Sequence, residues 1–397
     1  MRHGYYLLFV IVISTIFYPQ EINAQSLVEP VEPNEQERLI EYQLERLGTS
    51  EVEVFWKKVR EEYDGFLPEN QPHDLRDFFQ FEGSIFSMSL LKGFIQYVFH
   101  ELLLNGKLLV VIILLTVFSM ILENIQTAFE SNQVSKVAYA ITYLVIFILA
   151  INSFHVAMTY AQEAIANMVH FMMALIPLLL ALIASMGNIT TVSLFHPLII
   201  FLINTSGILI HNLVFPLLLF SSILGIVSAF SEQYKVSQLA NLLRNISIGL
   251  LGVFLTVFLG VVSVQGATSA VVDGVTIKAA KFVTSNFVPI VGRMFTDATD
   301  TVIGASLLIK NTIGLAGVII LIILTAFPAL KILSIALIFN ISAAVLQPLG
   351  NASVIACLNV IGKNLIFVFA ALATVCLMFF LGITIIIAAG NLSVMVR

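Results

Sequence analysis

Apolar runs long enough to cross a lipid bilayer recur along most of the chain and are separated by short polar segments. A helix needs about 20 apolar residues to cross the hydrocarbon core, so runs of this length predict membrane-spanning helices. The fold class predicted is therefore all-α, a polytopic helical membrane protein of seven to nine spans. The predicted spans lie at residues 108–122, 137–158, 169–186, 194–211, 213–230, 246–266, 312–330, 332–348 and 364–390.

Two stretches of this pattern allow more than one interpretation. Residues 194–230 fit either a tight pair of helices that turns at His211-Asn212, or one long helix that breaks at Pro216. Residues 312–348 are ambiguous in the same way around Pro328 and Lys331. Proline removes a backbone donor and disturbs a helix without always ending it, so the sequence leaves both alternatives open.

The two ambiguous stretches also share a short internal repeat. In each, Phe-Pro is followed by a serine six residues after the proline, and a cation-Asn pair precedes a later apolar run. In the predicted topology the two copies run in opposite directions, as in transporters with inverted repeats. The matching positions are Phe215-Pro216, Ser222 and Arg244-Asn245 in one copy, and Phe327-Pro328, Ser334 and Lys363-Asn364 in the other.

The N-terminal part has a different pattern. Residues 1–24 combine Arg2 with a short apolar stretch and a small residue at Ala24, which predicts a secretory signal peptide cleaved after Ala24. An uncleaved signal anchor is the alternative. Residues 25–105 then predict an acidic helical extracytoplasmic domain, and residues 106–397 a polytopic membrane domain.

Three helices are expected in the acidic domain. The first covers residues 35–47, and the second runs from Ser50 to about residue 63, with Ser50 and Glu53 in the spacing of a capping box. The third, over 83–104, is amphipathic and suits the membrane interface ahead of the first span. The apolar stripe of the second helix consists of Val52, Phe55, Trp56 and Val59.

Composition agrees with this class. The chain is 59% hydrophobic and 11% charged, whereas average soluble proteins carry roughly 25% charged residues. Acidic side chains predominate over residues 25–100 and basic ones slightly over the remainder. Neither part has the basic run of a nucleic-acid-binding surface, so membrane lipid is an expected partner and nucleic acid is not.

Motifs for catalysis, cofactors and metals are absent from the sequence. The glycines at 249–266 lack the lysine and the strand context of a phosphate-binding loop. His100-Glu101 has no second histidine at zincin spacing, and Cys357 and Cys376 lie in apolar runs without a paired-cysteine zinc signature. We therefore expect no enzymatic activity, no cofactor and no metal site.

One stretch, residues 260–311, breaks the apolar pattern. It holds the only aspartates after residue 100 and four cations, among them Lys310, and it begins with many small residues. Charge is costly in hydrocarbon, and small residues allow close helix approach or a helix break, so a conduit or a partner-binding surface is expected here. The candidate residues are Gln265, Asp273, Lys278, Lys281, Arg293, Asp297 and Asp300.

The topology of this stretch conflicts with the positive-inside rule. Counting spans from the signal peptide puts its four cations on the extracytoplasmic side, where few are expected. Either one span is miscounted, or residues 267–311 form a re-entrant or amphipathic segment with a helix break beside Gln265; the second interpretation is favoured. Arg293 and Asp297 are four residues apart and would pair on one helix face, in a wet cavity or on an ordinary exposed surface.

The same stretch resembles a known family. The run VSVQGATSAVVDGVTIKAAKFVTSNFVPIVGRMFTDATDTVIGASLLIKN, at 262–311, and AFPALKILSIALIFNISAAVLQPLG, at 326–350, resemble the core of the stage III sporulation protein AE family. Shorter matches are NGKLL at 105–109, FSEQYKVSQLANLL at 230–243 and CLMFFLGITIIIAAGNLSVMVR at 376–397. The resemblance covers the chain from about residue 85 to the end.

The resemblance implies a role in endospore formation. Proteins of this family are polytopic, permease-like subunits of a complex in the mother-cell membrane around the forespore. With ring-forming proteins, other membrane subunits and a secretion-type ATPase acting in trans, that complex forms an intercellular channel. The family has no agreed catalytic residues. An independent secondary transporter with inverted repeats, and a purely structural scaffold, are the alternatives.

Overall fold

The computed structural model describes most of the chain from residue 49 onward. The predicted signal peptide and the predicted helix over 35–47 lie outside the described residues, so these two predictions stand as they were. The described ranges are 49–68, 71–80, 88–128, 133–230, 236–287, 291–349 and 352–395.

The described part is helical, and no strand occurs in it. A small N-terminal group precedes a bundle of very long helices. The elements of the N-terminal group are α3 (Ser50–Tyr63), the 3-10 turn η2 (Asp64–Phe66), α4 (Asp77–Gln80) and α5 (Met88–Leu104). The remaining elements are α6 (Gly106–Ala128), α7 (Gln133–Ser185), α8 (Ile189–Leu209), η3 (Ile210–Val214), α9 (Phe215–Phe230), α10 (Ser237–Phe287), α11 (Val291–Leu346), the 3-10 turn η4 (Gln347–Leu349) and α12 (Ala352–Met395).

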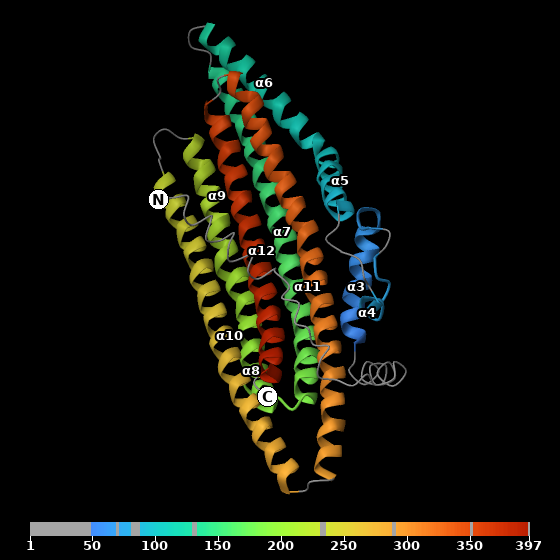
Figure 1. The fold of residues 1–397 in the computed structure, drawn as a ribbon. Coiled ribbons are helices and arrows are strands. Elements are labelled where there is room, and N and C mark those ends of the chain that lie inside the picture. Colours follow the sequence, from blue (N-terminus) through green and yellow to red (C-terminus); the bar gives the residue numbers. More distant parts are fainter. Residues whose placement is uncertain are drawn as a thin grey trace, which may run out of the picture.

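Five long helical rods lie side by side in the bundle: α7, the continuous run α8–η3–α9, α10, α11 and α12 (Figure 1). Within the described residues five helices are long and apolar enough to cross a membrane, and six if the bent pair α5 and α6 counts as one span. The 53 residues of α7 correspond to about 80 Å of helix at 1.5 Å per residue. The hydrocarbon core of a bilayer is about 30 Å thick, so α7 is far longer than one crossing requires.

The predicted number of seven to nine spans differs from this result because pairs of predicted spans are joined. Spans 137–158 and 169–186 are both part of α7, since the polar residues between them, 159–168, continue the helix. Spans 312–330 and 332–348 are likewise joined within α11, which continues through Pro328. Polarity alone does not end a helix that has neighbours to pack against.

Residues 194–230 also form one helical rod, as the second of the two interpretations proposed. His211 and Asn212 do not form a tight turn between two helices; they lie in the π-helical segment η3 directly before Pro216. A π-helical turn shifts the hydrogen-bond pattern by one residue, which lets the rod continue into a proline that would otherwise interrupt it. The break predicted at Pro216 is therefore a local defect.

The internal repeat runs in one direction. Consecutive long rods alternate in direction along the chain, and α9 and α11 are separated by the single rod α10 (Figure 1). The two Phe-Pro copies, in α9 and α11, therefore lie on parallel helices, and the cation-Asn pairs lie on α10 and α12, which are also parallel. The predicted inverted orientation is wrong. Joining spans 312–330 and 332–348 in α11 removes one crossing between the two cation-Asn pairs, so α10 and α12 are parallel.

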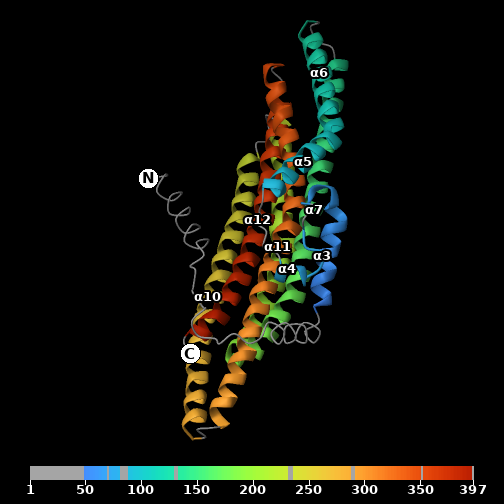
Figure 2. The ribbon, with the colours of Figure 1, turned by 45° about the vertical axis from the view of Figure 1, so that its right-hand side comes forward.

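The segment 267–311 is a helical hairpin. Its first half is the end of α10 and its second half the beginning of α11, and the two helices extend together beyond the other rods (Figures 1 and 2). The helix break predicted beside Gln265 is absent, because α10 continues to Phe287. Small residues near Gln265 serve close packing instead: a Cβ on Gly266 would lie 3.1 Å from Ile385 of α12 and 3.4 Å from Phe195 of α8.

The N-terminal group packs on the side of the bundle, against α7 and α11 (Figure 2). Phe327 of α11 stacks on Tyr63 of α3, with ring centroids 3.9 Å apart, and lies 4.9 Å from Tyr97 of α5. Trp56 is buried, and its Nε1 donates to the carbonyl oxygen of Pro72 at 2.9 Å. Burial raises the pKa of Tyr63 above its ordinary value, so its phenol remains neutral in this contact.

The predicted second helix is confirmed as α3, and its cap differs from the prediction. The N-cap residue is Thr49, whose side chain makes no capping hydrogen bond to the backbone. Thr49 Oγ1 instead donates to the Glu53 carboxylate at 3.4 Å. The capping box predicted from Ser50 and Glu53 is wrong by one residue at the helix start, although the apolar stripe is right: Val52, Trp56 and Val59 are buried.

Candidate functional site

Buried polar side chains gather at the end of the bundle where α7 turns into α8. The turn closes through Gly187, whose φ of 86° lies in the left-handed region, and the Asn188 amide nitrogen donates to the Ile183 carbonyl at 3.3 Å. Glycine adopts this conformation at little cost, which makes it the usual residue after a helix end. The turn brings the first residues of α8 beside α10, while α11 and α12 pack behind α7.

Asp273 of α10 binds the beginning of α8. Its two carboxylate oxygens accept hydrogen bonds from the backbone nitrogens of Thr190, at 2.9 Å, and Thr191, at 2.7 Å. The first amides of a helix have no intrahelical acceptor, and the helix start carries partial positive charge, so a carboxylate is stabilised there. Asp273 is only 3% exposed and caps α8 from a neighbouring helix. Sequence analysis identified Asp273 as an intramembrane carboxylate but not this capping role.

Further hydrogen-bonding capacity lies beside this carboxylate. Asn188 is the N-cap residue of α8, yet its side chain makes no capping bond. Within the described residues, both polar side-chain atoms of Asn188 and the Thr191 hydroxyl are buried without a hydrogen-bond partner. Buried polar groups are paired in nearly all structures, so this concentration of unpaired groups distinguishes the site from ordinary packing.

Lys310 of α11 is the fully enclosed cation at this end of the bundle, with 0% exposure. Its Nζ donates to the carbonyl oxygen of Ile387, at 3.1 Å, and to Asn391 Oδ1, both in α12. Gly390 makes room for it: a Cβ there would lie 2.8 Å from Nζ. No ion pair to a carboxylate is found for Lys310 within the described part of the chain.

Lys310 is a site residue that the sequence-based prediction does not include. It is one of the four cations in 260–311 but is not among the predicted site residues. A signal existed, because Lys310 lies three residues before Ile313 and seven after Ile303, on the helix face that both buried isoleucines share. An ionisable side chain inside an apolar bundle is a functional-site hypothesis by default.

The other predicted residues do not join this site. Lys281 and Asp300 form an ion pair that links α10 to α11 near the end of the hairpin. Lys278 is exposed and Gln265 is half-buried. The predicted Arg293–Asp297 pair lies outside what the structure describes, because no side-chain placement is available at either position.

Metal coordination finds no support in the described ranges, where no three His, Cys, Asp or Glu side chains come together. The two unpaired cysteines are Cys357, which is buried, and Cys376, which is half-buried. The candidate site thus consists of a capping carboxylate, an enclosed ammonium group and uncharged polar side chains. Such a set can orient helices or hold a small polar solute, and it has no arrangement of nucleophile and base.

The comparisons with known proteins agree with the sequence resemblance. The family model described as stage III sporulation protein AE matches residues 73–390. The chain is 56% identical over 375 residues to the stage III sporulation protein AE of Bacillus subtilis (strain 168), covering 94% of each chain. No solved structure matches. The family match covers most of the chain, and the chain therefore belongs to the stage III sporulation protein AE family.

Proposed function

We propose that the protein is a non-enzymatic membrane subunit of a multiprotein, secretion-like channel that connects mother cell and forespore during endospore formation. Membership of the sporulation family gives the biological setting. The observation that carries the proposal is the enclosed Lys310, an ammonium group inside an apolar helical bundle with uncharged partners on α12. Burying an ionisable group in an apolar bundle is costly, so an enclosed lysine indicates a functional role beyond ordinary packing.

The N-terminal group supports a role in assembly. Beside the middle of α7 and α11, α3 turns charged side chains outward: those of Lys57 and Glu61 are 77% and 69% exposed. Charges of this kind need water, so in the proposal this level of the bundle lies outside the hydrocarbon. The predicted signal peptide would put the same group on the extracytoplasmic side, between the two membranes, where ring-forming subunits could contact it.

The proposed source of energy is a separate subunit. The sequence contains no phosphate-binding loop, and a secretion-type ATPase acting in trans would supply nucleotide hydrolysis from the mother-cell side. Location in the mother-cell membrane around the forespore is part of the same proposal. Of the residues predicted for a conduit, Asp273 is enclosed at the same end of the bundle as Lys310, whereas Lys281 and Asp300 pair in the hairpin.

Purification from sporulating cells tests the proposal. An affinity-tagged full-length chain, solubilised from membranes in mild detergent, should retrieve other membrane subunits, ring-forming sporulation proteins and an ATPase, identified by mass spectrometry. Cells that express the untagged chain are the control. Recovery of the tagged chain alone, in several detergents and after chemical cross-linking in intact cells, would reject the proposal.

A secondary transporter is the alternative function, and the burial of two ionisable side chains, Asp273 of α10 and Lys310 of α11, favours it. An independent transporter moves solute when reconstituted alone into vesicles, whereas a channel subunit does not. Solute flux that is lost in a Lys310→Met variant would support the alternative. The same variant in sporulating cells should reduce late forespore gene expression under either function, so the reconstitution decides between them.

A further inference from the structure

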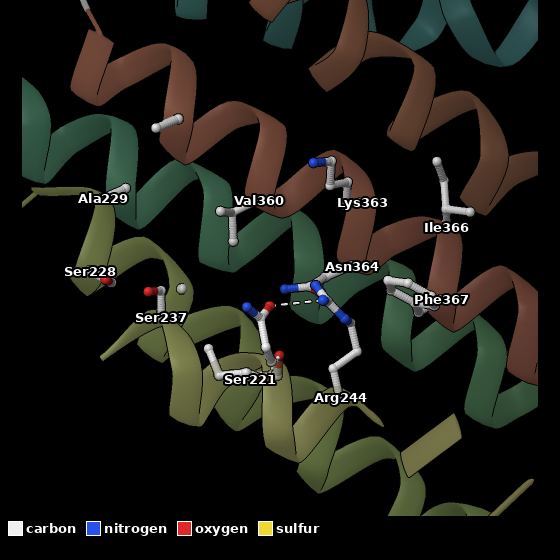
Figure 3. Close-up of a pocket in the computed structure, with 14 residues that line it drawn as sticks. Ser221, Ser228, Ala229, Ser237, Arg244, Val360, Lys363, Asn364, Ile366 and Phe367 are labelled. Atoms are coloured by element: carbon white, nitrogen blue, oxygen red, sulfur yellow. Dashed lines mark hydrogen bonds between the residues drawn. The ribbon is translucent and has the colours of Figure 1, made fainter. Parts of the chain in front are cut away.

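A second polar site lies far along α10 from Asp273, near the beginning of that helix. A pocket of about 690 Å³ opens between α9, α10 and α12 (Figure 3). Small-molecule sites commonly enclose about 300–1,000 Å³, so the pocket is large enough for a ligand of that size. None of the residues selected from the sequence as site candidates lines it.

The charged side chains that line the pocket are all positive. Arg244 of α10 and Lys363 of α12 both line it, and its fourteen lining residues, all within the described part, include no aspartate or glutamate. The pocket also lies at the start of α10, where Ser237 contributes to the wall, and helix starts carry partial positive charge. Two cations without a carboxylate, beside low-dielectric helices, favour an anion.

Among the described residues, Arg244 is held in place by contacts that occupy one of its donors. One terminal nitrogen donates to Asn241 Oδ1 at 2.8 Å, and the guanidinium carbon lies 5.1 Å from the centroid of the Phe367 ring. In Figure 3 its side chain extends from α10 toward α12, where Lys363 and Asn364 lie. A guanidinium group has five N–H donors in a fixed plane that matches two phosphate oxygens, and a cation stacked on an aromatic ring is already oriented.

Uncharged polar groups complete the wall. Asn364 is 1% exposed, and its Oδ1 has no hydrogen-bond partner among the described residues, so it can accept from a ligand hydroxyl. The hydroxyls of Ser228 and Ser237 also line the pocket, whereas the Ser221 hydroxyl is committed to the Ala240 carbonyl at 2.7 Å. A ligand with both phosphate oxygens and hydroxyl groups would satisfy the cations and Asn364 together.

Apolar surface adjoins the charged wall. Val360 and Ile366 of α12 line the pocket, and Ile366 is 41% exposed. Leu239 and Leu242 of α10, in the same part of the helix, are 48% and 54% exposed. A phosphate group next to exposed aliphatic side chains on membrane helices matches the boundary between the head group and the acyl chains of a phospholipid.

We propose that the pocket between α9, α10 and α12 binds a phosphate ester whose alcohol part carries hydroxyl groups. The ligand is the head group of an anionic phospholipid of the phosphatidylglycerol type. Arg244 and Lys363 bind the phosphate oxygens, and Asn364 accepts from a head-group hydroxyl. The two cations belong to the internal repeat, in which Arg244-Asn245 matches Lys363-Asn364, so the two parallel halves of the bundle each contribute one cation.

Lipid binding to the purified full-length protein tests this assignment. Thermal unfolding in detergent is followed with increasing dioctanoyl phosphatidylglycerol, with dioctanoyl phosphatidylcholine as the zwitterionic control, and with glycerol phosphate and inorganic phosphate as water-soluble probes. We expect a rise of several degrees in Tm with phosphatidylglycerol only. The doubly substituted Arg244→Gln, Lys363→Gln protein should need at least tenfold more of this lipid for the same shift. Lys278→Gln, an exposed cation elsewhere on α10, should bind as the unmodified protein does.

The other outcomes are equally decisive. Saturation by glycerol phosphate or inorganic phosphate, with no advantage for the lipid, would retain the phosphate site and overturn the lipid assignment. Equal stabilisation by phosphatidylcholine, or binding unchanged by the double substitution, would overturn the site. Where the double variant does not fold, Lys363→Gln alone carries the test, because this side chain is exposed.

Discussion

The enclosed site around Lys310 and the pocket between α9, α10 and α12 differ in what their cations contact. Lys310 is fully enclosed, and its ammonium group donates to the Ile387 carbonyl and Asn391. Arg244 and Lys363 border an open pocket, and within the described ranges Arg244 contacts Asn241 through one donor and the Phe367 ring through its face. The first cation is thus part of helix packing, whereas the other two are available to a ligand.

The two sites also differ in whether a carboxylate lies beside the cations. Asp273 lies at the enclosed end, where the first amides of α8 use both of its oxygens. The open pocket has no carboxylate in its wall. A buried charge whose hydrogen-bonding capacity is used by the protein contributes to stability, and its removal leaves partners unpaired. A charged side chain that makes few hydrogen bonds to the protein can be removed at small cost in stability, and its removal weakens ligand binding instead.

The largest effect is expected from Lys310→Ala. This change leaves a cavity beside Gly390 and removes the donor to the Ile387 carbonyl and Asn391. We expect a loss of about 3 kcal/mol in unfolding free energy, from the cavity and the unpaired acceptors together. Thermal unfolding of the purified protein in detergent measures it, with Lys278→Ala as the exposed control. Equal Tm values for the two variants would contradict the enclosed role of Lys310.

Asp273→Ala should have the next largest effect. The amides of Thr190 and Thr191 then lose their charged acceptor at the start of α8. Loss of a helix cap costs about 1–2 kcal/mol, and Asp273→Asn should cost less because one acceptor oxygen remains. Amide hydrogen exchange at the beginning of α8 should accelerate in the alanine variant. Unchanged exchange there would show that water replaces the carboxylate without loss.

A smaller effect is expected from Arg244→Gln in the absence of lipid. Its stacking on Phe367 and its bond to Asn241 are lost, and a partly exposed cation–π contact is worth about 0.5–1 kcal/mol. The Tm measured without added lipid should therefore fall by less than in the Asp273→Ala variant. A larger fall would mean that Arg244 belongs to the enclosed type, and the comparison between the two sites would fail.

The smallest effects should come from Lys363→Gln and Lys281→Gln. Lys363 is exposed, and the ion pair between Lys281 and Asp300 joins side chains that are 29% and 53% exposed. Solvent-exposed charges contribute about 0–1 kcal/mol at most, so each Tm should stay close to that of the unmodified protein. The two variants should differ only when phosphatidylglycerol is present. The lipid should then raise the Tm of Lys363→Gln less than the Tm of Lys281→Gln.

Local pattern was enough for the helical class and for several elements. The apolar runs predicted helices that all appear in the bundle, and the stripe of Val52, Trp56 and Val59 identified the buried face of α3. The number of spans was not predictable in the same way. Residues 159–168 have the polarity of a loop, yet they continue α7, and one side of this stretch is buried at Ala161, Ala164, Ile165 and Met168.

Local pattern was also not enough to predict the surroundings of each candidate residue. Asp273, Lys278 and Lys281 lie within nine residues of one another, and the structure places the first in the core, the second on the surface and the third in an ion pair across a hairpin. Helical periodicity assigns residues to faces of one helix. It does not say which face meets a neighbour, or that Asn391 lies opposite Lys310.

Residue order alone is enough to predict an all-helical protein with membrane-length apolar segments, and the polar order at 262–311 identifies the sporulation family. These features depend on the composition and order of neighbouring residues. Only the folded bundle shows that paired spans are continuous rods, that the repeat is parallel, and that Arg244 and Lys363 border one pocket. Each of these depends on contacts between residues far apart in the chain, where packing and burial, and not local preference, set the free energy.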